Sequence, residues 1–243
     1  MERLKKIRPH DRAVEMLEWY IQENHLKPHA KLPGERELCE LWNLNRSTLH
    51  SAIQELVEEH ILYSEKGAGT FVAPPRLERN LQDGKSTTES MRSTGYFLWT
   101  EVLESRVEES DAYISKKLRI PAGSKVFYLR RLRMRGNTPL MIETSYINYE
   151  YCEGIESRSF SETSLYQILE GMGVAMDSGE ESVSITYATQ EEAKLLKVEP
   201  DQFLYYVSGH IDDREGNPIE FFKNVARSDQ IRYTSVLKRN TAE

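Results

Sequence analysis

The chain has 243 residues, of which 39% are hydrophobic and 29% are charged, and its formal net charge is −7. This length exceeds what one small domain needs, and the composition is ordinary for a soluble globular protein. No run approaches the ~18 consecutive apolar residues of a membrane span. No apolar segment follows the charged N-terminus, so a signal peptide is not indicated either. We therefore expect a cytoplasmic protein with no membrane contact.

Three helices are predicted in the first 60 residues. Residues 11–25 carry apolar side chains at helical spacing, and residues 35–42 form a short helix that begins with acidic residues. Asn45 is a good N-cap for a third helix, which runs to about His60 and has an apolar stripe to bury. Two short helices joined by a tight turn are a helix-turn-helix candidate.

A small β-hairpin is predicted directly after these helices. Residues 61–64 and 70–73 are short strand candidates, and the loop between them contains Gly67 and Gly69. A helix-turn-helix followed by such a hairpin is a winged helix. We expect this domain to occupy residues 1–75.

The third predicted helix leaves several polar side chains off its apolar stripe: Arg46, Ser47, His50, Ser51 and Gln54. Such side chains hydrogen-bond base edges and phosphates, and the N-terminal residues of this helix are those that meet a DNA major groove. The simpler interpretation is a solvated polar face, but the glycine-containing hairpin that follows favours DNA binding. Residues 1–75 hold 10 Lys/Arg against 12 Asp/Glu. DNA affinity must therefore come from a local patch, and we expect two copies to bind together.

The remainder of the chain predicts a second domain after a linker. Residues 76–95 are polar and contain Gly84, Lys85 and Gly95, which is typical of a linker, and residues 96–243 alternate strand and helix patterns. Helices are predicted at 112–120, 164–172 and 191–197, and strands at 125–133, 139–147 and 180–188.

An internal repeat lies within this second domain. A pattern of helix end, strand, Gly-Asn turn and strand begins at Leu118 and again at Leu196, with its turns at Gly136 and Gly216. Two such units indicate a duplicated sheet with helices on a face, which is an α+β layer fold.

Motifs in the first domain resemble the GntR family of bacterial regulators. Residues 32–38 resemble the family's "LPSERELA" run, residues 45–56 its recognition helix, and residues 67–72 its "GxGTFV" wing. The resemblance implies a winged helix-turn-helix that contacts DNA through its second and third helices and its wing tip. The predicted DNA-binding residues are Arg36, Arg46, Ser47, Thr48, His50, Ser51, Gln54, Lys66, Gly67 and Gly69. Relatives often carry a basic residue where this chain has His50 or Ala68, so we expect a shallower salt dependence here.

The order of motifs over residues 95–240 resembles the UTRA ligand-binding domain of HutC-type GntR regulators. The motifs that carry the resemblance are Leu118-x-Ile120-Pro121-x-Gly123, Arg131-Leu132-Arg133, Ser164-Leu165-Tyr166 and Gly216-Asn217-Pro218-Ile219-Glu220. The resemblance implies a domain similar in fold to chorismate lyase, with a mainly antiparallel sheet and helices. It also implies effector binding and dimerisation.

A sensing site is predicted around two arginines. Arg131 and Arg133 lie two residues apart on a predicted strand, so their side chains point to the same face. Two adjacent guanidinium groups repel unless an anion such as phosphate or carboxylate lies between them. The alternative is a structural ladder in which Glu143 and Glu220 hold the arginines. By resemblance, the effector pocket comprises Thr100, Arg131, Arg133, Glu143, Ser164, Tyr166 and Glu220.

Two departures from the relatives leave the identity of the ligand open. The position of Glu101 is basic in many of them, and that of Ile231 is Tyr. Together these features predict a homodimeric transcription regulator, a repressor by resemblance. A small anionic metabolite (a sugar phosphate, a phosphonate or an organic acid) changes its affinity for double-stranded operator DNA.

Two other functions remain as alternatives at this point. One is a regulator whose second domain only dimerises, and the other is a small lyase or hydrolase. The chain contains no phosphate-binding glycine loop, HExxH or GxSxG motif, which argues against the enzyme. No cofactor or metal is expected.

Overall fold

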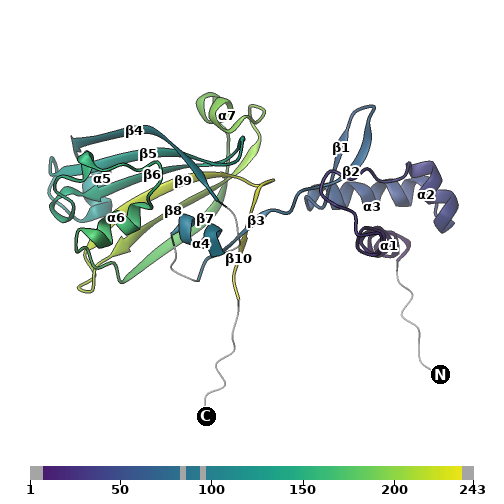
Figure 1. The fold of residues 1–243 in the computed structure, drawn as a ribbon, viewed down its shortest axis with the longest axis horizontal. Helices are drawn as coiled ribbons and strands as arrows, with labels where there is room; N and C mark the ends of the chain where they lie inside the picture. The colour runs from purple at the N-terminus through teal and green to yellow at the C-terminus, as the bar shows by residue number, and fades with distance from the viewer. Residues whose placement is uncertain (1–7, 83–85, 94–96, 237–243) are drawn as a thin grey trace, which may run out of the picture. The chain divides into compact units, whose positions relative to one another are not determined.

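The computed structural model describes residues 8–82, 86–93 and 97–236. These divide into two compact units, with the boundary between residues 76 and 77. The first unit contains helices α1 to α3 and strands β1 and β2, and the second contains the remaining elements (Figure 1). No helix in the described ranges is long and apolar enough to cross a membrane.

The first unit is a three-helix bundle with a hairpin, as the sequence predicts. Its helices are α1 (Pro9–Glu23), α2 (Glu35–Trp42) and α3 (Arg46–Glu58). The side-chain oxygen of Asn45 accepts a hydrogen bond from the backbone N–H of Thr48 at 2.7 Å, which fixes the start of α3. The core consists of fully buried apolar side chains from all three helices: Leu17, Leu38, Leu49 and Leu56.

The hairpin is formed by β1 (Leu62–Glu65) and β2 (Gly69–Val72), which pair antiparallel. Its tip contains Gly67, whose φ of +78° lies in the left-handed region that favours glycine. The sequence therefore builds a short wing on the C-terminal side of α3.

A six-stranded sheet forms the centre of the second unit. The strand order is β4-β5-β6-β9-β8-β7, and each neighbouring pair is antiparallel. The strands are β4 (Trp99–Glu109), β5 (Lys125–Arg135), β6 (Thr138–Asn148), β7 (Ser178–Tyr187), β8 (Phe203–Asp212) and β9 (Pro218–Arg227). The predicted α+β class and mainly antiparallel sheet are confirmed.

The strand order also explains the repeat in the sequence. The first half runs β4-α5-β5-β6 and the second runs β7-α7-β8-β9, and β6 and β9 pair at the centre of the sheet. Helices α5 (Ala112–Leu118) and α7 (Gln190–Leu196) each end at a residue with left-handed backbone, Arg119 and Lys197. The two halves are therefore equivalent βαββ units that share one sheet.

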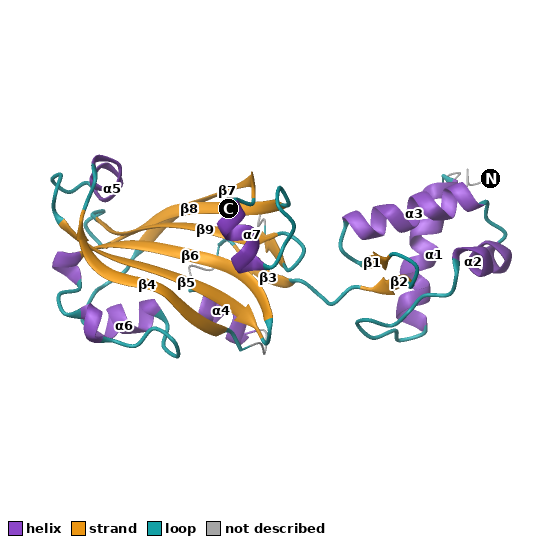
Figure 2. Ribbon diagram, turned by 90° about the horizontal axis from the view of Figure 1, so that it is seen from above, coloured by secondary structure: helices purple, strands orange, loops and turns teal. Residues whose placement is uncertain are grey.

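Helices cover both faces of this sheet (Figure 2). Helices α5 and α7 pack on one face, against residues such as Phe221 and Val225 of β9. Helix α6 (Leu165–Gly171) and the residues at the start of α4 (Thr87–Ser93) lie on the other face, where they line a cavity with β5, β6 and β9. Two short 3-10 helices connect β6 to α6, at Tyr149–Tyr151 and Ile155–Ser157.

The predicted linker at residues 76–95 differs from the structure. Leu77–Asn80 forms strand β3, which pairs in parallel with β10 (Ile231–Thr234), and Thr87–Ser93 forms α4. The reason is that Leu77 and Met91, each 1% exposed, pack with Ile231 in an apolar cluster. The Gly84, Lys85 and Gly95 of the predicted linker lie outside the described residues.

Candidate functional sites

The predicted DNA-binding residues lie on an exposed face of α2, α3 and the wing. The side chain of Arg36 is 94% exposed and that of Arg46 is 87% exposed. His50, Ser51 and Gln54 are exposed along α3. Cationic and amide side chains on one exposed helix are suited to phosphates and base edges.

Two members of the set also have local roles. The Ser47 hydroxyl donates to the Asn45 side chain at 2.9 Å, so it takes part in the cap of α3. Thr48 is partly buried, and its backbone N–H is bound to the same side chain. Ser47 therefore presents a hydroxyl that is already oriented by the cap.

Glu35 joins the two helices of the motif electrostatically. Its carboxylate lies 3.0 Å from Nδ1 of His50 and 3.8 Å from Nε of Arg46. These contacts hold two side chains of α3 against the first turn of α2. The contact with Glu35 thereby fixes the position of the His50 side chain on the exposed face.

The wing presents Lys66, Gly67 and Gly69, all of which are exposed. Lys31 was not among the predicted DNA-binding residues; it is exposed and forms an isolated bridge with Phe71 of β2. Its side chain lies against Gly69, because a Cβ atom at that glycine would come within 2.9 Å of Lys31 Cε. The wing therefore carries a second basic side chain beside the glycine turn.

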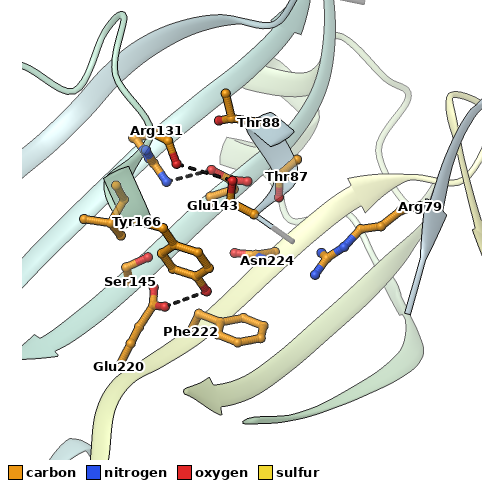
Figure 3. Close-up of a pocket in the computed structure, with 13 residues that line it drawn as sticks. Arg79, Thr87, Thr88, Arg131, Glu143, Ser145, Tyr166, Glu220, Phe222 and Asn224 are labelled. Carbon is orange, nitrogen blue, oxygen red and sulfur yellow. Dashed lines mark hydrogen bonds and ion pairs between the residues drawn. The ribbon is translucent and has the colours of Figure 1, made fainter. Parts of the chain in front are cut away.

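The predicted effector pocket is built on one row of cross-strand neighbours. Arg131 on β5 is paired in register with Glu143 on β6, which is paired with Asn224 on β9. Arg131 Nη2 donates to Glu143 Oε2 at 2.9 Å, and both side chains are at least 93% buried. Figure 3 shows this row with Tyr166 and Glu220 beside it.

Arg133 lies deeper than Arg131. Its side chain is 2% exposed, its Nη1 lies 3.7 Å from Glu143 Oε2, and its Nη2 donates to the hydroxyl of Thr88 at 2.7 Å. The residue paired with it on β4 is Thr100, which is buried. Arg133 and Thr100 were both predicted to line the pocket, but neither of them does; they lie behind its wall.

The other predicted residues line the cavity. The Tyr166 hydroxyl donates to Glu220 Oε2 at 2.9 Å, and Ser164, 2% exposed, lies at the start of α6. The cavity has a volume of about 50 Å³. The five predicted residues that line it are Arg131, Glu143, Ser164, Tyr166 and Glu220.

The two pocket carboxylates differ in their electrostatic environment. Burial acts to raise the pKa of Glu143, but the guanidinium groups of Arg133 and Arg131 outweigh it and lower that pKa below its ordinary value. Burial raises the pKa of Glu220, against the hydrogen bonds from Ser145 and Tyr166. Glu143 is thus firmly held as an anion, and Glu220 binds a proton more readily than an exposed glutamate does.

Several arginine nitrogens around the pocket are buried without a hydrogen-bond partner among the described residues. They are Nε of Arg79, Nε and Nη1 of Arg131, and Nε of Arg133. Buried donors are almost always satisfied in folded proteins, by protein, water or ligand. Because Arg79 and Arg131 line the cavity, their nitrogens are available to an acceptor there, whereas Arg133 lies behind the wall.

Several residues that line the cavity were not predicted from the sequence: Arg79, Ser86, Thr87, Thr88, Ser145, Phe222 and Asn224. A signal for the segment that starts α4 was present in the sequence. Ser86 and Glu89 have the spacing of a capping box, and the Glu89 carboxylate accepts from both the backbone N–H and the hydroxyl of Ser86 at 3.0 Å. Arg79 has no comparable local signal.

A second cavity of about 240 Å³ shares Arg79, Tyr166 and Phe222 with the first. Its lining is rich in carboxylates: Glu89, Glu170, Asp177, Glu180 and Glu181. The two cavities therefore adjoin; the first holds Arg79 and Arg131 with two glutamates, and the second holds an excess of acidic side chains.

A winged helix with exposed arginines on its second and third helices, joined to a domain that encloses a charged cavity, defines a DNA-binding regulator that responds to a small molecule. The comparisons with known proteins agree. Residues 9–72 match the model of the gntR family of bacterial regulatory proteins, and residues 94–232 match the UTRA domain. The chain belongs to the GntR family, in its HutC-type branch with a UTRA domain, and it is a transcription regulator rather than an enzyme.

Relatives of similar length support this assignment. The chain is 30% identical over 224 residues to the HTH-type transcriptional repressor NagR of Bacillus subtilis (strain 168), which covers 92% of this chain and 91% of that one. It is 30% identical over 211 residues to a probable fructoselysine utilization operon transcriptional repressor of Escherichia coli (strain K12), with 86% of each covered. The fold is similar to that of PhnF from Mycobacterium smegmatis, with a TM-score of 0.69 and 21% identity over 93% of this chain and 99% of that one.

Proposed function

We propose that this regulator is a homodimeric, cytoplasmic repressor whose affinity for operator DNA changes when an anionic metabolite binds between its arginines. The observation that carries the proposal is the set of buried, unpartnered guanidinium nitrogens around the cavity. An anion satisfies such donors with charge-assisted hydrogen bonds, which a neutral ligand cannot do as strongly. The named relatives include transcriptional repressors, which supports repression as the direction of control.

The two adjoining cavities suit a ligand with two distinct parts. The first cavity, of about 50 Å³, has room for a compact anionic group such as a phosphate, phosphonate or carboxylate beside Arg131. The adjoining cavity has room for the remainder of the metabolite. Glu143, Glu220 and the Ser164 hydroxyl line the first cavity and are placed to bind hydroxyl or amino groups next to the anionic group. Tyr166 lines both cavities and is placed to contact the remainder. We therefore favour a sugar phosphate, a phosphonate or an organic acid with polar substituents.

For the DNA, we propose contacts from Arg36, Arg46, Ser47, His50 and Gln54, with Thr48 and Ser51 beside them and Lys66, Gly67 and Gly69 at the wing. Arg46 and Ser47 lie in the first turn of α3, where a recognition helix meets base edges. Because the unit carries few cations, one copy is expected to bind weakly. Two copies on a two-fold symmetric operator double the number of phosphate contacts.

The edges of the sheet support dimerisation. Strand β4 is protected by charged side chains, including Glu101, Glu104 and Arg106. Strand β7 forms the other edge and has no charged residue from 182 to 187. It exposes Ile185 (69%) and Tyr187 (58%). Monomeric proteins protect such edges, so we propose that β7 contacts a second copy.

The test combines selected DNA with a ligand panel. The full chain would select its binding site from a random DNA pool, and fluorescence anisotropy would measure its affinity for that site with sugar phosphates, phosphonates, organic acids and uncharged sugars. A true ligand at ~100 times its dissociation constant stabilises the protein by roughly 2.7 kcal/mol, which a thermal shift detects. Arg131→Gln is expected to abolish the response. Arg130→Gln is the matched control, because Arg130 neighbours Arg131 but bonds Glu191 instead.

Three outcomes would contradict parts of the proposal. If no ligand of the panel changes the DNA affinity while DNA binding itself is intact, the second domain only dimerises. A response to uncharged sugars alone would exclude the anion. An asymmetric selected site, with a monomer in sedimentation at micromolar concentration, would exclude the homodimer.

A further inference from the structure

Arg79 is an arginine of the effector pocket that comes from outside the six-stranded sheet. It lies on β3, three residues after the boundary between the two units, and lines both cavities. Figure 3 shows its side chain extended from β3 toward Asn224 and Glu143. The pocket therefore contains a side chain from the first element that follows the DNA-binding unit in the chain.

The contacts of Arg79 leave part of its guanidinium group available. Its side chain is 11% exposed, and Nη2 donates to Glu181 Oε2 on β7 at 2.9 Å. The guanidinium carbon lies 5.8 Å from the centre of the Tyr233 ring. Nε is buried and has no hydrogen-bond partner among the described residues. Nη2 is thus held by Glu181, and Nε remains without a partner in a side chain that lines both cavities.

The strand that carries Arg79 is held by few interactions. Strand β3 has four residues and pairs with β10 over four register positions, in a two-stranded sheet separate from the main one. Its anchor in the apolar core is Leu77. A short two-stranded pair is marginal unless other contacts support it. A ligand that contacts both β3 and the main sheet would therefore increase the local stability of this segment.

We propose that Arg79 binds the effector's anionic group together with Arg131, so that a bound ligand ties β3 to the main sheet and reports occupancy to the segment that follows the DNA-binding unit. This inference rests on the proposed function, because it assumes an anion in the first cavity. It assigns to Arg79 a role in both affinity and coupling. The Glu181 contact competes for the same guanidinium group when the cavity is empty.

The test uses inorganic phosphate as the probe and the full chain. Isothermal titration would measure phosphate affinity, and hydrogen exchange would follow the peptide covering residues 76–82 with and without phosphate. Arg79→Gln is expected to weaken phosphate binding about tenfold or more, because it removes a charge-assisted donor. It is also expected to abolish the added protection of β3. Glu181→Gln is expected to strengthen binding, because it releases Arg79 from its partner.

The proposal thus predicts opposite changes in phosphate affinity for Arg79→Gln and Glu181→Gln. If the ion pair only stabilised the fold, both variants would weaken phosphate binding or leave it unchanged. Arg232→Gln, at an exposed arginine of the paired strand β10, is the matched control and should behave as wild type. If Arg131→Gln abolishes phosphate binding while Arg79→Gln does not, the inference about Arg79 is overturned and the proposed function stands. If phosphate does not bind the wild-type protein at millimolar concentration, both the inference and the anionic ligand class fall.

Discussion

Replacing Glu143 by Gln tests whether the pocket arginines depend on a carboxylate. The substitution keeps the size of the side chain but removes the charge that lies 2.9 Å from Arg131 Nη2 and 3.7 Å from Arg133 Nη1. At an effective dielectric constant of ~20, each of these contacts corresponds to about 4 to 6 kcal/mol of Coulomb attraction. The cost of desolvating the charges offsets much of this. Removing one partner of a buried pair destabilises proteins by about 3–5 kcal/mol, and we expect a loss in this range.

Urea unfolding of the full chain would measure this loss, with the transition of the second unit followed separately from that of the first. Glu191→Gln is the matched control, because its carboxylate bonds Arg130 at 2.6 Å but is 64% exposed. Such an exposed pair contributes only about 0–1 kcal/mol. A loss for Glu143→Gln no larger than that of the control would refute the argument.

Phosphate and pH provide two further checks on the same variant. Phosphate should stabilise Glu143→Gln more than the wild type, because the anion replaces the missing carboxylate between the guanidinium groups. The pKa of Glu143 is lowered in the folded state. The stabilisation of the fold by ionised Glu143 is therefore fully present above the ordinary glutamate pKa of about 4.5. It is lost as pH falls through the lower pKa that Glu143 has in the folded state. The stability difference between wild type and variant should shrink in that acid range and stay constant above it.

Three other substitutions test the remaining features. Arg46→Ala should make the dependence of log operator affinity on log salt shallower by about 0.9, and an unchanged slope would mean that Arg46 contacts no phosphate. Glu220→Gln should raise the melting temperature at pH 8 but not at pH 4, because the raised pKa of Glu220 makes its ionised form unfavourable in the fold; an equal effect at both pH values would point to packing instead. Ile185→Lys should dissociate the dimer in sedimentation, whereas Glu104→Lys on the opposite edge should not, and the reverse result would place the interface at β4.

Local signals in the sequence were sufficient to predict much of the fold, and the family resemblance supplied five of the thirteen residues that line the pocket. The Asn45 cap, the wing glycines and the strand predicted at residues 125–133 each depend on neighbouring residues, and all three are present in the structure. The two-residue spacing of Arg131 and Arg133 placed both side chains on one face, and both lie near Glu143. The tight turn alone would set Ile142 opposite Arg131, and a register shift between Arg133 and Met134 brings Glu143 to that place instead, so the pairing of Arg131 with Glu143 could not be predicted from the turn.

Features that depend on distant parts of the chain could not be predicted in this way. Strand β3 is four residues long and is stabilised by pairing with β10, about 150 residues later in the chain, so its sequence has no strand pattern of its own. Strand β4 was missed because it is an edge strand rich in charged residues. Arg79 could not be assigned to the pocket for the same reason, since its position follows from the pairing of β3. Thr100 and Arg133 were assigned to the pocket by resemblance, but burial places them behind its wall.

The doubled βαββ architecture has a consequence for the charges that a ligand meets at its two ends. Thr100 on β4 is paired with Arg133 on β5, and at the equivalent place in the second half Gly179 on β7 is paired with Ile211 on β8. Gly179 and Ile211 line the acidic cavity. Thr100 and Arg133 instead stand behind the wall of the first cavity, which holds two arginines and two glutamates, whereas the acidic cavity holds Arg79 with five carboxylates. The proposed ligand would therefore meet a different balance of charge at each of its two ends.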